Sequence, residues 1–260
     1  MNTTHGCVKS SDAALRFIPH ALIFLLLVIT GCAGLKPLTP LDPARKAAVL
    51  EECRRPFLAG SYRLVHALET VMPNGSSGTA IGVLMADPRT QHFRTVMMTI
   101  EGFVLFDTEA AKTLTVHRAV PPFDAPAFAE GLAEDIRLAF FAPAGEPAAW
   151  GEGEAGTRVC RYERADGGLV EVATQRDGVV LVHLYGAGQG GQKRVTMAPP
   201  RRPGLSETVE IRGGWPSYTL RLRLLESEAL DDSGSVPAAT PPGTEPGAPG
   251  PGNEKGKTIP

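Results

Sequence analysis

The chain has 260 residues, with 26 Lys plus Arg against 28 Asp plus Glu, and a formal net charge of −2. Its basic residues form no cluster longer than a pair, such as Arg54-Arg55 or Arg201-Arg202. Because nucleic acids are bound through dense positive charge, this composition argues against a nucleic-acid partner. The length between the two unusual ends of the chain fits one domain of ordinary size.

The N-terminal segment has the layout of a secretory signal. Lys9 and Arg16 precede nine apolar residues, 21–29, which are too few for the ~20 that a membrane-spanning helix requires. The next residues complete the sequence Ile29-Thr30-Gly31-Cys32, which resembles the lipobox of bacterial lipoproteins. The alternative is a chance cysteine after an ordinary signal or a short anchor.

The lipobox resemblance implies how the mature chain is held. It implies that residues 1–31 are removed, that the Cys32 thiol is diacylated and that residues 32–42 form a tether. Ala33 follows the cysteine where an Asp would imply retention in the inner membrane. The resemblance therefore implies a lipid anchor on the periplasmic side of the outer membrane.

Two further cysteines, Cys53 and Cys160, remain in the predicted domain. In an oxidising compartment such a pair can form a disulfide, and a loop of this length predicts a stabilisation of ~4 to 5 kcal/mol. The alternative is two separate buried thiols that behave as small apolar side chains.

The predicted domain, residues 43–226, begins with a helix and continues with strands. Asp42 and Pro43 are typical of a helix start, and the helix is expected over 43–58. After Gly60 apolar residues alternate, which indicates strands joined by antiparallel turns. About eleven strands are expected, over 61–69, 79–87, 93–100, 103–107, 113–118, 157–163, 169–174, 179–185, 193–197, 207–211 and 218–225.

One segment in the middle of the chain has helical periodicity instead. From Asp124 to Phe141 apolar residues recur every four positions, at Phe128, Leu132 and Ile136. This stripe predicts a helix that lies on the sheet. The neighbouring Glu134-Asp135 pair is expected to be a solvated edge of that helix.

The C-terminal segment 227–260 has the composition of a disordered tail. From residue 231 onward, 13 of 30 residues are Pro or Gly, which leaves little apolar surface to bury. It is expected to be a spacer or a partner-binding arm, or else a dispensable extension.

The order of a short helix, about five strands, one helix and about six strands resembles the LolA and LolB lipoprotein-localisation factors. The segments Val120-Pro121-Pro122-Phe123 and 135–141 are similar to the mid-chain helix of a group of lipoproteins of that fold. The resemblance implies a mainly β fold with some α, an unclosed antiparallel β-barrel whose opening is covered by helices. It also implies an early loop with an exposed apolar residue, which here corresponds to a short turn at Glu101-Gly102.

No enzyme motif is complete in the chain. Residues 186–191 contain G-x-G-x-x-G, but a strand and not a helix is expected to follow, so these glycines indicate a hairpin loop. The histidines His66, His92, His117 and His183 are too far apart in sequence for a local metal site. We expect no catalytic residues, no metal and no cofactor.

Continuous apolar runs at residues 96–98, 103–106 and 179–182 predict strands covered on both faces or lining a cavity. Met97 suits a cavity for flexible acyl chains, with Phe128, Leu132 and Ile136 facing the ligand from the helix. Together with the LolA/LolB resemblance, these runs imply a monomer that binds acyl chains of a lipid or lipoprotein. The alternatives are a tightly packed core without a cavity and a ligand-free scaffold of an envelope complex.

Overall fold

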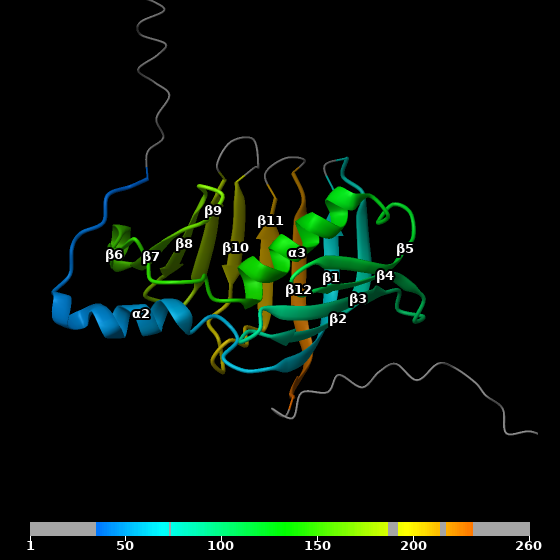
Figure 1. The fold of residues 1–260 in the computed structure, drawn as a ribbon, viewed down its shortest axis with the longest axis horizontal. Coiled ribbons are helices and arrows are strands. Elements are labelled where there is room, and N and C mark those ends of the chain that lie inside the picture. The colour runs from blue at the N-terminus through cyan, green and yellow to red at the C-terminus, as the bar shows by residue number, and fades with distance from the viewer. Residues whose placement is uncertain (1–34, 73, 187–191, 214–216, 231–260) are drawn as a thin grey trace, which may run out of the picture.

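The computed structural model describes residues 35–72, 74–186, 192–213 and 217–230, which form one large antiparallel sheet with helices on one face (Figure 1). The helical elements are η1 (Pro43–Arg45), α2 (Lys46–Arg54), α3 (Pro126–Phe140) and the single turn η2 (Glu154–Gly156). The strands before α3 are β1 (Tyr62–Val71), β2 (Ser77–Asp87), β3 (His92–Met98), β4 (Val104–Ala110) and β5 (Leu114–Ala119). The strands after α3 are β6 (Ala149–Glu152), β7 (Arg158–Glu163), β8 (Leu169–Thr174), β9 (Val180–Tyr185), β10 (Lys193–Met197), β11 (Thr208–Arg212) and β12 (Thr219–Ala229).

The sheet consists of two meanders joined at its centre. The strand order is β5-β4-β3-β2-β1-β12-β11-β10-β9-β8-β7-β6, and every neighbouring pair is antiparallel. The first and last strands pair with each other, so β5 and β6 are the two edges and the sheet does not close. The chain between those two edge strands carries α3 (Figure 1).

The expected fold class, an unclosed antiparallel barrel with a short N-terminal helix and a mid-chain helix, is confirmed. The sheet has twelve strands where about eleven were expected. The missing one is β6, Ala149-Trp150-Gly151-Glu152, a four-residue edge strand with an Ala and a Gly, which are poor strand formers.

One face of the sheet, here called the inner face, carries the core. Along each strand alternate side chains point to it, so that Leu64, Phe93, Phe106, Val182 and Val195 are all buried. Helix α3 packs against β5, β9 and β11 on this face. The apolar runs predicted to be covered on both faces have only their inner members buried: Met97 is 9% exposed, whereas the neighbouring Val96 and Met98 are half-buried.

Helix α2 is fixed to the other end of the inner face. Asp42 accepts a hydrogen bond from the Ala44 backbone N–H, as expected of a helix cap, and α2 packs against β6, β7 and β8. Cys53 of α2 and Cys160 of β7 form a disulfide, with Cα atoms 6.3 Å apart. This bond ties the N-terminal helix to a strand 107 residues further along the chain.

The ends of the predicted domain are partly docked on it. Within the predicted tether, Thr39 pairs with Glu152 of β6, and Arg161 donates to the Lys36 carbonyl oxygen at 2.6 Å. At the other end, residues 227–229 belong to β12 and pair with β1, so the tail cannot begin before residue 230. The predicted signal, Cys32 and residues 231–260 lie outside the described residues.

Candidate functional site

A small apolar cavity lies between α3 and the centre of the sheet. Its floor is a row of three residues in register on neighbouring strands, His66, Gly82 and Met97. Leu132, Asp135, Ile136 and Phe140 of α3 form its roof, and further apolar side chains of β1, β2, β11 and β12 close its sides. The cavity has a volume of about 40 Å³.

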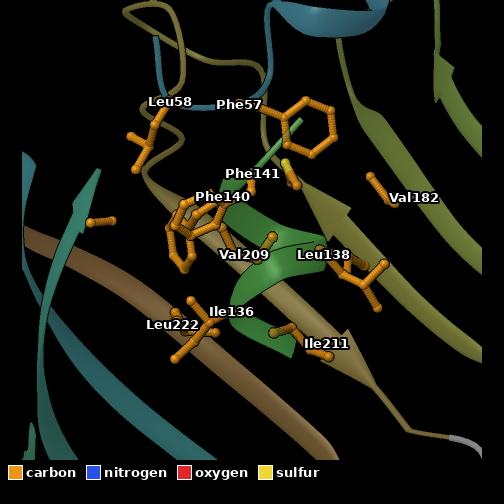
Figure 2. Packing of buried hydrophobic residues seen from close by; sticks show 14 of the residues in the cluster. Phe57, Leu58, Ile136, Leu138, Phe140, Phe141, Val182, Val209, Ile211 and Leu222 are labelled. Atoms are coloured by element: carbon orange, nitrogen blue, oxygen red, sulfur yellow. The ribbon is translucent and has the colours of Figure 1, made fainter. Parts of the chain in front are cut away.

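Three of the four residues predicted to face a ligand line this cavity: Met97, Leu132 and Ile136. Figure 2 shows Ile136 beside Leu222 and Ile211, on the inner face of β12 and β11. Phe128 lies elsewhere on α3. Its ring packs edge-on against Phe106, with centroids 5.1 Å apart, and contacts Phe123 at the same distance.

A second, open space runs along the opposite side of α3. This groove has a volume of about 820 Å³ and lies between α3 and the strands β7, β8 and β9. Buried apolar residues form its base, among them Tyr162 and also Leu138 and Val182, which Figure 2 shows. Charged residues such as Glu130 and Arg164 lie along its walls. Helix α3 therefore separates the large groove from the small cavity.

The volumes decide what each space can hold in this conformation. Ligand pockets typically have volumes of about 300–1,000 Å³, so the closed cavity is far too small for an acyl chain, whereas the groove lies within that range. A chain can reach the apolar floor of the sheet only if α3 moves away from it.

A cluster of polar side chains, here called the latch, holds α3 to the sheet. The Lys193 ammonium of β10 donates to Asp135 Oδ1 at 2.7 Å and to the Gly131 carbonyl oxygen at 3.1 Å. The Tyr218 hydroxyl, next to the start of β12, donates to Asp135 Oδ2 at 2.5 Å. Gly213 makes room for the Tyr218 ring, because a Cβ atom at that position would overlap it.

The prediction that Asp135 belongs to a solvated edge of the helix is wrong, because Asp135 is only 4% exposed. Its burial raises the pKa of the carboxyl group, and the Lys193 ammonium and the Tyr218 hydroxyl act in the opposite direction. The predicted neighbour Glu134 is half-buried and also contacts Lys193, at 3.1 Å. Helical periodicity could not reveal this, since both partners lie more than 55 residues away in sequence.

His66 is the unusual residue of the cavity. It is 4% exposed, its ring lies 5.5 Å from that of Phe140, and neither ring nitrogen has a hydrogen-bond partner among the described residues. Burial lowers the pKa of His66 to about 4, so the imidazole is neutral at pH 7. In the sequence, His66 is one of four histidines weighed as metal ligands, and its burial was not predicted.

The three other histidines in the described part of the chain, His92, His117 and His183, lie on the opposite, outer face of the sheet. His92 and His117 both contact the Glu109 carboxylate, at 2.8 and 3.3 Å, and this pairing lowers the pKa of Glu109. Within the described ranges no group of three or more His, Cys, Asp or Glu residues could hold a metal ion. The strand β10 follows the glycine-rich segment, as expected, although residues 187–191 lie outside the described ones.

The turn between β3 and β4 has five residues, Thr99 to Phe103, and is longer than the expected two-residue turn at Glu101-Gly102. It carries two exposed apolar side chains, Ile100 at 75% and Phe103 at 53%. None of the helices in the described part of the chain is both long and apolar enough to cross a bilayer.

The fold is an unclosed antiparallel sheet of twelve strands with helices on one face. No family model matches the chain, and no curated protein matches it in sequence. Among solved structures, a LolA superfamily protein from Nitrosomonas europaea is 8% identical, with a TM-score of 0.43 over 72% of this chain and 94% of that one. A domain from Vibrio parahaemolyticus, described as a candidate outer membrane lipoprotein-sorting protein, is 10% identical, with a TM-score of 0.44 over 74% and 96%.

The latch generates a stability prediction. Lys193→Met leaves the buried Asp135 carboxylate without its cation, and we expect a loss of about 3 kcal/mol in the free energy of unfolding at pH 7. Lys36→Met is the matched control, because Lys36 forms an ion pair in which its own side chain is 71% exposed, and it should leave the free energy of unfolding nearly unchanged. Urea unfolding measures both; equal losses would contradict the assignment of the latch.

The buried imidazole generates a pH prediction. The unfolded chain binds a proton at His66 near pH 6.5, whereas the folded chain does so only near pH 4, so stability falls as the pH drops through this window. At pH 5 this amounts to about 2 kcal/mol relative to pH 7. The variant His66→Leu should not show this loss of about 2 kcal/mol in the free energy of unfolding. Any pH dependence that comes from Asp135 should be the same in both proteins. Urea unfolding of both proteins at pH 7 and pH 5 measures the difference, and identical losses would be the contrary result.

Proposed function

We propose that this chain is a binding protein, rather than an enzyme, that holds acyl chains of a lipid or lipoprotein between α3 and the inner face of its sheet. In this proposal it is a monomer anchored through acylated Cys32 on the periplasmic side of the outer membrane, where it carries or inserts such chains. The observation that carries the proposal is that one helix alone roofs the cavity at the centre of an apolar inner face.

The free energy of apolar burial is large enough for an acyl chain to replace part of α3 against the sheet. Burying a chain of about 14 methylenes contributes roughly 11 kcal/mol, and breaking a buried ion pair such as Asp135–Lys193 costs about 3–5 kcal/mol. The same displacement exposes Leu132, Ile136 and Phe140 of α3. The ligand must therefore replace part of the α3 stripe against the sheet, so that apolar contact is exchanged rather than lost.

The two spaces beside α3 suggest how a ligand enters. The groove is large and its base is apolar, whereas the cavity on the other side of the helix is small. A shift of α3 away from β11 would join the two into one apolar channel. An acyl chain that first lies in the groove then has access to the cavity floor.

The small size of the cavity also supports a second candidate function. A cavity of about 40 Å³ is compatible with a core that never opens, in which case the domain is a tethered scaffold in an envelope complex. The exposed Ile100 and Phe103 would then be part of a contact with a protein.

Ligand binding separates the two functions. Gly82 forms part of the cavity floor, and a Cβ atom there would lie 3.0 Å from the Leu68 side chain, so Gly82→Val fills the floor. Using the variant Cys32→Ser to exclude the protein's own acyl chains, we expect the fluorescent fatty acid cis-parinaric acid to bind. The additional Gly82→Val substitution should weaken this binding at least tenfold.

Gly78→Val is the matched control, because the same change on the same strand falls at an exposed position. It should leave the dissociation constant unchanged. Absence of cis-parinaric acid binding, or equal binding by all three proteins, would favour the scaffold.

A further inference from the structure

The cavity floor contains one polar group that its surroundings do not satisfy. His66 lies between Leu64 and Leu68 on the inner face of β1, in an environment of aliphatic and aromatic side chains. Leaving a buried polar group without a hydrogen bond is unfavourable, so such a group calls for an explanation. The described residues offer His66 no hydrogen-bond partner.

The sheet is shaped around this position. His66 is in register with Gly82 of β2, and Gly82 is in register with Met97 of β3. Because Gly82 has no side chain, the Leu68 side chain packs over it, 3.0 Å from where a Cβ atom would lie. The strand pairing is irregular on both sides of this row, between Val65 and His66 against β12 and between Met97 and Met98 against β4. Such irregularities are typical of places where a strand redirects a side chain.

The few polar side chains around the cavity can satisfy a single hydrogen-bond acceptor, such as a carbonyl oxygen, better than a buried water molecule. A buried water normally makes two to four hydrogen bonds. Besides His66 only Thr95 and Asp135 contribute polar side chains to the lining. Both carboxylate oxygens of Asp135 already accept hydrogen bonds from the latch, and Thr95 lies on β3, two strands away from His66. A carbonyl oxygen needs a single donor, and a neutral imidazole supplies one N–H.

The charge of the ligand follows from the same surroundings. A carboxylate would be buried next to the Asp135 carboxylate, without a cation of its own, which is strongly unfavourable. A free fatty acid such as cis-parinaric acid therefore binds through its hydrocarbon tail and keeps its carboxylate outside the cavity. An ester or amide carbonyl carries no charge and is attached to the apolar chain that the remaining walls fit.

We propose that His66 donates a hydrogen bond to the ester or amide carbonyl of a bound acyl chain, and that the site selects acylated molecules over plain hydrocarbon. This inference rests on the proposed function, since it places the first carbonyl of the chain in the space that α3 covers. His66 thereby sets how deep the chain lies.

Competition binding tests the assignment. With cis-parinaric acid as the reporter, methyl dodecanoate and dodecane are titrated into the Cys32→Ser protein and into the same protein carrying His66→Leu. We expect His66→Leu to weaken methyl dodecanoate binding threefold to tenfold, the range for loss of one neutral hydrogen bond, and to leave dodecane binding unchanged or tighter. Thr95→Val is the matched control. It removes the hydroxyl group that lines the cavity, keeps the shape of the side chain, and should affect the binding of neither ligand.

The outcomes distinguish this inference from the proposed function. If both ligands bind and His66→Leu weakens both equally or neither, the carbonyl assignment is overturned while acyl-chain binding stands. If neither ligand binds, the proposed function fails and the inference with it. If His66→Leu weakens only methyl dodecanoate binding, dipalmitoyl phosphatidylglycerol and a tripalmitoylated lipopeptide are compared in the same assay. The one whose binding is weakened by His66→Leu is the source of the carbonyl that the site takes.

Discussion

The structure depends on the need to cover the apolar inner face of an open sheet. A sheet that closes into a barrel buries its own interior, but here β5 and β6 remain apart and the inner face needs another cover. Helix α3 supplies it with a stripe that includes Leu132, Ile136 and Phe140. Because apolar contact is not directional, the same surface can accept other apolar groups of suitable shape.

The topology holds α3 at its ends and leaves its position to side chains in between. The helix connects the two edge strands, so the chain fixes where it starts and stops. The hydrogen bond from the Leu58 backbone N–H to the Phe140 carbonyl oxygen secures its C-terminal end, close to where the disulfide fixes α2. Along its length, Asp135 adds a directional contact to the apolar ones. Such contacts place the cover well, and the proposed function requires that they can also be broken.

Local patterns predicted most of the fold, because strands and helices leave periodic signals. The alternation at Leu220 and Leu222, with Arg221 between them, placed the last strand and its buried face correctly. The same reasoning identified the α3 stripe and three of the residues that line the cavity. The element it missed, β6, is too short and too poor in β-branched residues to show a pattern.

The site itself was less predictable, because its polar part is assembled from distant segments. Asp135, Lys193 and Tyr218 come from three different elements, and each one taken singly is typical of a surface position. His66 lies in a strand whose apolar neighbours are regular, so sequence alone gave no sign that its imidazole lacks a partner. Both the latch and the environment of His66 depend on which strands lie next to one another in the sheet.

The central claim is that α3 is a removable cover, and a distance measurement tests it most directly. Spin labels at Glu130, on the exposed side of α3, and at Arg223, exposed on β12, report how far the helix lies from the sheet. On saturation of the Cys32→Ser protein with methyl dodecanoate, the account predicts a shift to longer distances. An unchanged distance distribution in protein that has demonstrably bound the ligand would contradict it.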